Sequence, residues 1–355
     1  MEWLQRFAIE ATRSDALVYR DNHLQLLCAG LLGECGSVNA EIKKMDRERE
    51  AYPYYLGRLL EEMGDFLWYL VRLLTVRLGS AEAIQSLPNA SQKERKDGVA
   101  LAIDLAQATN ELVQMVAKGE DKSVLASAGK IWELLLRIAT LHGIKLESVA
   151  DQNVQKTQSR WAAKKTYTRL FDEDFPKEEQ LPRKFSVVFI ERVRGSRVEV
   201  LLRYGDVNIG DRLTDNMHDA DDYRFHDVFH FAHAAILGWS PVVRSILRCK
   251  RKSNSDIDEN QDGARAIVVE EAIAAAVFGR AKNMKFYEGL QQVDFDLLKQ
   301  IKELVSGFEV EHLPMWQWEV AILEGYRVFR QLRASRGGEV TWDLGARSLE
   351  WRPPA

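Results

Sequence analysis

The stretches LLGECGSVNAEIKK (residues 31–44) and LLEEMGDFLWYL (residues 59–70) decide the fold of the first half of the chain. Apolar residues recur in both at intervals of three and four, which predicts two amphipathic α-helices. Their apolar faces nevertheless carry the acids Glu34, Glu62 and Asp65. Burying an isolated carboxylate is costly because the charge loses its hydration. A pair of helices that tolerates acids at these positions predicts a cation among them.

These acids have two interpretations. In the first, they belong to solvated helix faces and pair with Lys43, Lys44 and Arg58. In the second, the two helices face each other and the carboxylates bind a metal ion. Oxygen ligands favour Mg²⁺, which usually keeps some of its waters and takes further ligands from substrate phosphates. The presence of two such helices, joined by a short connection, favours the second interpretation.

Helical periodicity extends over residues 1–165, which contain few helix breakers. It predicts an antiparallel α-helical bundle as the first domain. The expected helices cover residues 2–18, 22–49, 53–79, 93–118, 121–142 and 145–164.

The composition changes after the bundle. The stretch FDEDFPKEEQLPRK (171–184) combines two prolines with many charges, which is typical of a linker. Two β-branched runs flank Gly195 in residues 185–206 and predict a small β-hairpin. Helical periodicity then returns at 221–239, 262–284, 293–308 and 315–335. The predicted fold class is therefore mainly α, with a bundle at 1–168, a linker at 169–184 and a mostly helical α+β domain at 185–355.

The 355 residues are 46% hydrophobic and 29% charged, with a formal net charge of −4. This balance indicates a globular protein and excludes a general nucleic-acid binder, whose net charge would be strongly positive. The three cysteines form no CxxC pair, which favours a reducing compartment. The N-terminal residues do not resemble a signal peptide, and no apolar run approaches the length of a membrane helix. We therefore expect a soluble, cytoplasmic protein without a membrane partner.

A third motif, LESVADQNVQKTQSRW, occupies residues 146–161. Its Asn153, Lys156 and Arg160 lie on one side of a helix, where the two cations could neutralise a triphosphate. Together with the two acidic stretches, in this order, it resembles the MazG-type, all-α nucleoside triphosphate pyrophosphohydrolases over residues 1–165. The resemblance implies hydrolysis of a nucleoside triphosphate to monophosphate and pyrophosphate, with Mg²⁺ or Mn²⁺ as cofactor. It also implies a homodimer or a higher homo-oligomer.

The resemblance assigns roles to individual residues. Glu34, Glu62 and Asp65 would be the Mg²⁺ ligands, and either of the two glutamates would be the catalytic group that orients or deprotonates the attacking water. The residues that would bind the nucleotide are Asn153, Lys156, Arg160 and, unless it belongs to the core, Trp68.

The sequence departs from the family pattern at Ser37, where the ExxE motif has its second glutamate. The site thereby lacks one charge and one strong metal ligand. Glu41, one turn further along the helix, could supply the missing ligand, or Glu61 could do so. The alternative is a nucleotide-sensing bundle with weakened catalysis. Such a bundle would regulate a metal-dependent or phosphate-binding activity of the second domain, for example in phage defence.

Four of the seven histidines lie between positions 218 and 233. His226 and His230 are four residues apart, a spacing that lets two imidazoles bind one metal ion from one helix. This predicts a second metal site of unknown identity, or alternatively a buried hydrogen-bond network with Tyr223, Asp222 and the acidic helix that carries Glu270 and Glu271. The other candidate ligands are Asp227, Glu270 and Glu271.

The basic run RSILRCKRKSN (244–254) follows the histidines. It predicts either a solvated loop or a contact to phosphate or nucleic acid. The block that starts at Gly210 and contains the histidines and the acidic helix resembles the C-terminal domain attached to MazG-like domains in bacterial proteins. This resemblance implies a domain arrangement without a defined reaction, and it favours joint action of His226, His230 and Glu271.

Overall fold

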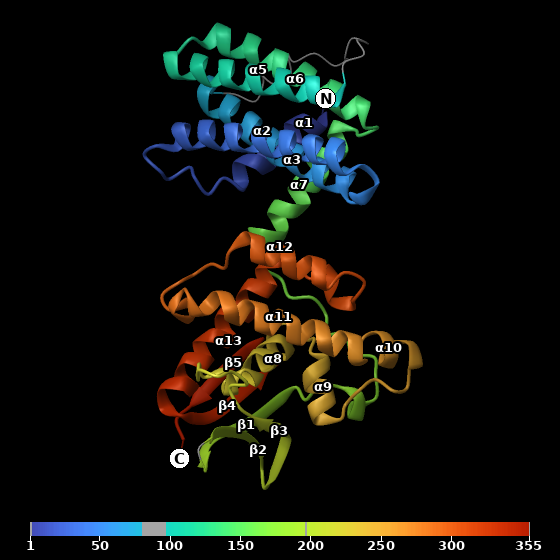
Figure 1. Cartoon of the computed structure of the whole chain (residues 1–355), viewed down its shortest axis with the longest axis vertical. Helices are drawn as coiled ribbons and strands as arrows, with labels where there is room; N and C mark the ends of the chain where they lie inside the picture. Colours follow the sequence, from blue (N-terminus) through green and yellow to red (C-terminus); the bar gives the residue numbers. More distant parts are fainter. Residues whose placement is uncertain (1, 80–96, 196, 355) are drawn as a thin grey trace. The chain divides into compact units, whose positions relative to one another are not determined.

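The computed structural model describes residues 2–79, 97–195 and 197–354, and the chain forms two compact units, Met1–Ala163 and Lys164–Ala355 (Figure 1). Helices dominate both units, and the second also contains an antiparallel sheet. The predicted fold class, mainly α with a small β part, is confirmed. Over the described ranges, no helix has the length and apolar character that a membrane span requires.

The first unit is built from helices. The helix that begins the chain ends at Arg13 and not at residue 18, because Asp15 turns inward and accepts hydrogen bonds from Arg72 at 2.7 and 2.9 Å. The other predicted helices match to within a few residues, and the predicted start at 93 lies outside the described residues. The elements are α1 (Glu2–Arg13), α2 (His23–Glu48), η1 (Arg49–Ala51), α3 (Tyr55–Leu78), α5 (Gly98–Lys118), α6 (Asp121–Leu141) and α7 (Leu146–Arg160).

Helices α2 and α3 form the central pair of the first unit (Figure 1). Leu31 of α2 and Phe66 of α3 are fully buried in the same core. Burying a side chain of this kind contributes about 1.5–3 kcal/mol. Gly64 lets α7 approach α3, because a Cβ at this position would lie 3.1 Å from the Cβ of Asn153. The packing of α2, α3 and α7 therefore brings the three sequence motifs together.

The second unit contains three of the four helices that the sequence predicts there, namely α11 (Ala264–Lys282), α12 (Phe295–Leu304) and α13 (Met315–Ser335). The stretch 221–239 is not one helix, since it forms a 3-10 turn, a short α-helix and a π-helical turn. Helices α9 and α10 were not predicted, because six or seven residues are too few to show a helical period. The helical elements are η2 (Lys177–Glu179), η3 (Tyr223–Phe225), α8 (Asp227–Ala232), η4 (His233–Leu237), α9 (Pro241–Leu247), α10 (Ser255–Asn260), α11 (Ala264–Lys282), η5 (Lys285–Tyr287), α12 (Phe295–Leu304), η6 (Glu309–His312) and α13 (Met315–Ser335).

The sheet of the second unit is larger than the predicted hairpin. Its strands are β1 (Lys184–Arg194), β2 (Arg197–Tyr204), β3 (Val207–Leu213), β4 (Gly337–Asp343) and β5 (Ser348–Arg352), in the order β3-β2-β1-β4-β5. The hairpin itself is confirmed, with Arg194 opposite Arg197 and a left-handed Gly195 between the strands. Strand β4 pairs with β1 although about 150 residues separate them in sequence, a distance over which local patterns give no signal.

Helices α8 and α13 pack against the sheet (Figure 1). The ring of Phe231 in α8 lies 5.8 Å from that of Phe189 in β1 and 5.4 Å from that of Trp342 in β4. Gly325 of α13 approaches α8 so closely that an added Cβ would lie 3.1 Å from the Cβ of Ala232. The helix that carries the histidines is thus fixed by both the sheet and α13.

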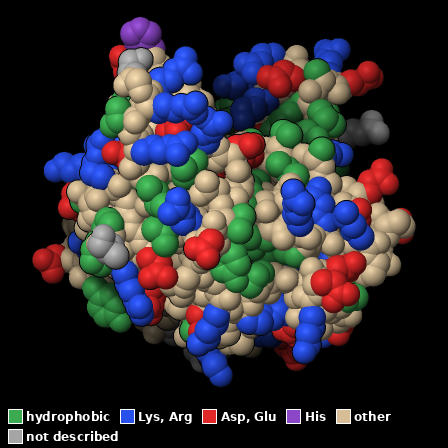
Figure 2. Space-filling view, turned by 90° about the horizontal axis from the view of Figure 1, so that it is seen from below, with side chains coloured by type: hydrophobic (Ala, Val, Ile, Leu, Met, Phe, Trp, Pro, Cys, Tyr) green, Lys and Arg blue, Asp and Glu red, His purple; other side chains and the backbone are tan. Residues whose placement is uncertain are grey.

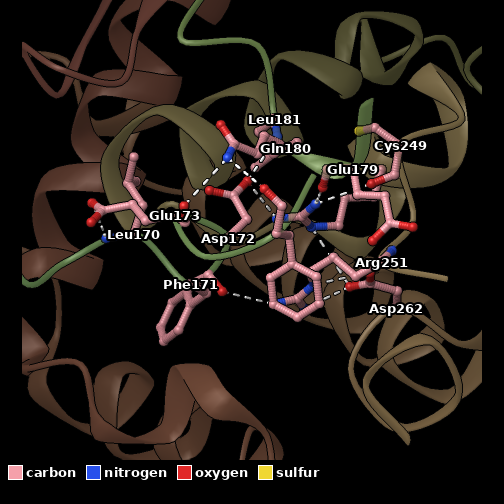
Figure 3. Close-up of polar contacts among 12 residues, drawn as sticks. Leu170, Phe171, Asp172, Glu173, Glu179, Gln180, Leu181, Cys249, Arg251 and Asp262 are labelled. Atoms are coloured by element: carbon pink, nitrogen blue, oxygen red, sulfur yellow. Dashed lines mark hydrogen bonds and ion pairs between the residues drawn. The ribbon is translucent and has the colours of Figure 1, made fainter. Parts of the chain in front are cut away.

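Residues 169–184, which the sequence predicts as a linker, belong to the second unit. Figure 3 shows Asp172 at the centre of a polar cluster. Its buried carboxylate accepts hydrogen bonds from the backbone N–H of Leu181 at 2.7 Å, from Arg183 at 2.8 Å and from Arg244 at 2.8 Å. The charges and prolines of this stretch therefore anchor it to the domain, and the boundary between the units falls at residues 163 and 164.

We predict that Asp172→Ala destabilises the second unit by about 3 kcal/mol, because it leaves the buried guanidinium of Arg244 without its main carboxylate partner. Urea denaturation of the full chain measures this change. Asp174→Ala is the matched control, because the Asp174 side chain is 76% exposed and pairs only at the surface with Arg169. Equal stability of the two variants would show that 169–184 is a linker after all.

Candidate functional site

Three carboxylates meet between α2 and α3. Glu34 comes from α2, and Glu62 and Asp65 come from α3. One carboxylate oxygen of each lies within 4.8 Å of one oxygen of the others, and all three side chains are half-buried. The structure therefore brings together the three acids that the sequence singles out as Mg²⁺ ligands. Their spacing suits oxygens that share one cation.

The electrostatics of this cluster are unfavourable without a cation. Burial raises the pKa of Glu34 to about 7, and the negative charges of Asp65 and Glu62 act in the same direction. Lys156 and a hydrogen bond from Ser37 only partly oppose this rise. A positive charge beside Glu34 would stabilise its ionised form and lower this pKa.

Helix α7 brings the third motif to the same acids. The side-chain amide of Asn153 donates to Asp65 Oδ1 at 2.7 Å, and the ammonium of Lys156 binds both oxygens of Asp65. Lys156 Nζ also lies 3.6 Å from Glu61. Arg160, at the end of α7, is buried, and its guanidinium lies 5.9 Å from the ring centre of Trp161. Two of the four predicted nucleotide-binding residues, Asn153 and Lys156, thus lie at the carboxylate cluster.

Glu41 is placed elsewhere. Its buried carboxylate accepts a hydrogen bond from Tyr52 and pairs with Lys44. Seven residues separate it from Glu34, which corresponds to a rise of about 10 Å along a helix. The expectation that Glu41 replaces the missing glutamate at Ser37 is therefore corrected: in this structure Glu41 ties the end of α2 to the segment that follows.

Trp68 has contacts within the first unit. Its indole N–H donates to the hydroxyl of Ser14 at 2.9 Å, and its ring makes an edge contact with Tyr69. The side chain packs on the hydrophobic core. This arrangement agrees with the interpretation of Trp68 as a core residue.

Tyr69, which follows Trp68 and shares a helix face with Glu62, lies beside the carboxylate cluster. Its ring lies so close to α2 that a Cβ on Gly30 would be only 2.1 Å from it. Burial raises the pKa of the Tyr69 hydroxyl, and the charges of Glu34 and Asp65 raise it further. Gly30, one helical turn before Glu34, therefore leaves room for the ring.

The second unit holds another cluster of metal-type side chains. One ligand atom from each of His226, Asp227 and His230 lies within 4.8 Å of the others, and all three residues are buried. Glu271 of α11 is half-buried, with one oxygen 3.4 Å from His230 Nε2. His218 does not belong to the cluster, because it is fully exposed and contacts Asp219 at 3.2 Å.

Glu270 lies beside this cluster and is fully buried. It accepts hydrogen bonds from Nδ1 of His230 and of His233, each at 3.0 Å, from the Ser240 hydroxyl at 2.8 Å and from the Val242 N–H at 3.0 Å. Burial acts to raise the pKa of Glu270, but His230 and these bonds lower it to about 2. Burial likewise acts to lower the pKa of His230, but Glu270 raises it to about 10. The sequence analysis included neither His233 nor Ser240 in the site.

The hydrogen-bond network predicted as the alternative is thus present in part, because the acidic helix supplies Glu270 as the partner of the imidazoles. Asp222 binds Arg224 and Arg333 instead of a histidine. Tyr223 takes part through its backbone oxygen, which lies 2.9 Å from His226 Nδ1.

The basic run 244–254 is neither a solvated loop nor a basic surface as a whole. Arg244 and Arg251 are buried and bind Asp172, Asp262 and Glu309. These contacts hold the run to the domain (Figure 3). On the face shown in Figure 2, Lys and Arg side chains are interspersed with Asp and Glu. The nucleic-acid contact considered for this run has no support from its two buried arginines.

The family described as the MazG C-terminal domain matches residues 166–355. No curated protein and no solved structure matches the chain. The matched residues correspond closely to the second structural unit, Lys164–Ala355, and make up more than half of the 355 residues. The chain therefore belongs to the family of the MazG C-terminal domain.

Proposed function

We propose that the first unit hydrolyses a nucleoside triphosphate to a nucleoside monophosphate and pyrophosphate, with Mg²⁺ or Mn²⁺ as cofactor. The observation that carries this proposal is the meeting of Glu34, Glu62 and Asp65 beside Lys156 of α7. The second unit supports it, because it matches the MazG C-terminal domain, and the motifs of the first unit resemble the MazG-type pyrophosphohydrolases. By the same resemblance, we propose that the protein acts as a homodimer or a higher homo-oligomer.

The donor set fits Mg²⁺. It consists of carboxylate oxygens alone, which hard cations prefer, and it is half-buried, so that phosphates and water can complete the coordination. The pKa of Glu34 is raised first by burial and then by the charges of Asp65 and Glu62, and a bound cation would oppose this rise. When bound, Mg²⁺ would neutralise phosphate charge and orient the leaving pyrophosphate.

The residues of the chain supply the remaining chemistry. We propose that Glu34 or Glu62 orients the attacking water and accepts its proton through a carboxylate oxygen that the ion does not occupy. The water oxygen forms a bond to the α-phosphorus, and the bond from this phosphorus to the bridging oxygen breaks, so that its electron pair leaves with pyrophosphate. Lys156 can leave Asp65 for a phosphate oxygen, while Asn153 keeps Asp65 in place.

The first prediction concerns the products. Purified protein incubated with the NTPs and dNTPs and Mg²⁺ should release monophosphate and pyrophosphate. Glu62→Gln or Asp65→Asn should lower kcat/KM at least about 100-fold, because each removes a ligand of the cation that neutralises charge in the transition state. Chromatography of the nucleotides measures both products. Glu111→Gln is the matched control, since Glu111 is an exposed acid that pairs with Lys130 on α5 and α6. Full activity in the Glu62 and Asp65 variants would refute the proposal.

A second prediction concerns Ser37, which stands near Glu34 and acts to lower its pKa. Ser37→Glu adds a fourth carboxylate to the cluster, so the Mg²⁺ concentration for half-maximal activity should fall about tenfold, which corresponds to about 1.4 kcal/mol of binding. A kcat that changes little would mean that Ser37 belongs to a working site. A rise in kcat of about 100-fold or more would instead favour the nucleotide sensor, whose catalysis the serine weakens.

A third prediction concerns stability without metal. Because the pKa of Glu34 is higher in the folded chain than in the unfolded chain, its contribution to stability is lost as pH rises from about 4.5 to about 7. In EDTA, the free energy of unfolding of Glu34→Gln should equal that of the wild type at pH 5. At pH 8 it should be about 1 kcal/mol larger, a value reduced for the partial exposure of Glu34. Urea denaturation at both pH values measures this. Added Mg²⁺ should reverse the order at pH 8, and an unchanged order would contradict metal binding by Glu34.

A further inference from the structure

The second unit contains a cluster that the proposed hydrolysis does not use. It comprises two imidazoles and two carboxylates, from His226, Asp227, His230 and Glu271. The ligand atoms of the first three lie within 4.8 Å of one another. The question is whether this cluster is a closed hydrogen-bond network or a site with unsatisfied ligand atoms.

His226 is oriented by its backbone neighbour. Its Nδ1 lies 2.9 Å from the carbonyl oxygen of Tyr223. A carbonyl oxygen can only accept, so Nδ1 carries the proton and the neutral imidazole has its lone pair on Nε2. The Tyr223 ring stacks on the imidazole at 4.3 Å with an angle of 2°, which fixes the ring plane. His226 Nε2 lies 3.4 Å from Asp227 Oδ1.

His230 is oriented in the same way by a carboxylate. Its Nδ1 lies 3.0 Å from Glu270 Oε1, and this arrangement is the usual support for a metal-binding histidine, whose second nitrogen donates to a carboxylate. His230 Nε2 is fully buried and has no hydrogen-bond partner of good geometry among the described residues, although Glu271 Oε2 lies 3.4 Å away. Buried polar atoms are normally satisfied, so this nitrogen requires an explanation.

Glu270 is not itself a free ligand. Its two oxygens already accept hydrogen bonds from His230, His233, Ser240 and the Val242 backbone. His233 reaches this carboxylate from the π-helical turn η4, a rare conformation that is frequent at functional sites. Glu270 therefore orients the imidazoles through its hydrogen bonds. The carboxylates that remain to bind an ion are the two others of the cluster.

We propose that His226, His230, Asp227 and Glu271 bind one divalent transition-metal ion. Two imidazole nitrogens with two carboxylates favour Mn²⁺, Fe²⁺, Co²⁺ or Zn²⁺ over Mg²⁺ and Ca²⁺, which prefer oxygen ligands. The Glu271 side chain is 41% exposed, so the ion is accessible from the solvent on this side and can keep a water ligand. Glu270 is a positioning residue, because it acts through the imidazole of His230.

The test measures metal in the full chain. Protein freed of metal with a chelator is dialysed against Zn²⁺ or Co²⁺ in excess Mg²⁺, which saturates the oxygen site of the first unit, and its metal content is measured by mass spectrometry. Wild-type protein should retain about one equivalent, and Co²⁺ should give the visible absorption of a site with nitrogen ligands. His226→Gln and Glu271→Gln should each lose most of it. His218→Gln should retain it, because His218 is exposed and lies outside the cluster.

Each outcome decides the proposal. Retention by His226→Gln and Glu271→Gln, or wild-type protein that binds neither ion, would overturn it. Loss of the ion from the double variant Glu62→Gln/Asp65→Asn would also overturn it, because the ion would then belong to the first unit. Since Glu271 is half-exposed, Glu271→Gln should keep the circular dichroism spectrum of the wild type, so its metal content stays decisive even where His226→Gln fails to fold. The metal content is measured without nucleotide, so it decides this proposal even if the protein hydrolyses no nucleoside triphosphate.

Discussion

The repulsion among three carboxylates held on two packed helices is the constraint on which the first unit depends. Helices α2 and α3 cannot move apart to relieve it, because Leu31 and Phe66 lie in one core on the same pair of helices. Each of these buried side chains contributes about 1.5–3 kcal/mol, which is comparable to the cost of raising one carboxyl pKa by one or two units. Hydrophobic packing therefore holds the acids in place before any cation or nucleotide arrives.

The second unit buries more charge, but most of it is satisfied internally. Asp172 and Glu270 each accept bonds from several donors, and Arg251 binds both Asp262 and Glu309. Removing one partner of such a group is costly, so these contacts hold the domain together. The Nε2 atom of His230 differs, because it is buried and receives no hydrogen bond of good geometry from the described residues. This difference separates structural charges from candidate sites.

The sequence predicts the helical units and the meeting of Glu34, Glu62 and Asp65 because these follow from local periodicity. It does not predict strands β4 and β5, which depend on pairing with residues far away in the chain. The linker prediction also differs from the structure, because charge and proline content cannot show that Asp172 meets Arg244, 72 residues later. Glu41 shows the same limit. Helical spacing predicts the helix face on which Glu41 lies, but it does not predict that the Tyr52 hydroxyl donates a hydrogen bond to it.

The two clusters also differ in when each would hold its ion. The first offers three carboxylates, one of them bound by Lys156, and Ser37 adds no charge. Mg²⁺ loses its waters reluctantly and is usually held by one or two carboxylates together with substrate phosphates, so the phosphates of a nucleotide should tighten the binding of Mg²⁺ at this site. The second offers two oriented imidazoles, which bind transition metals without a substrate. One chain would thus combine a site that its substrate completes with one that is complete by itself.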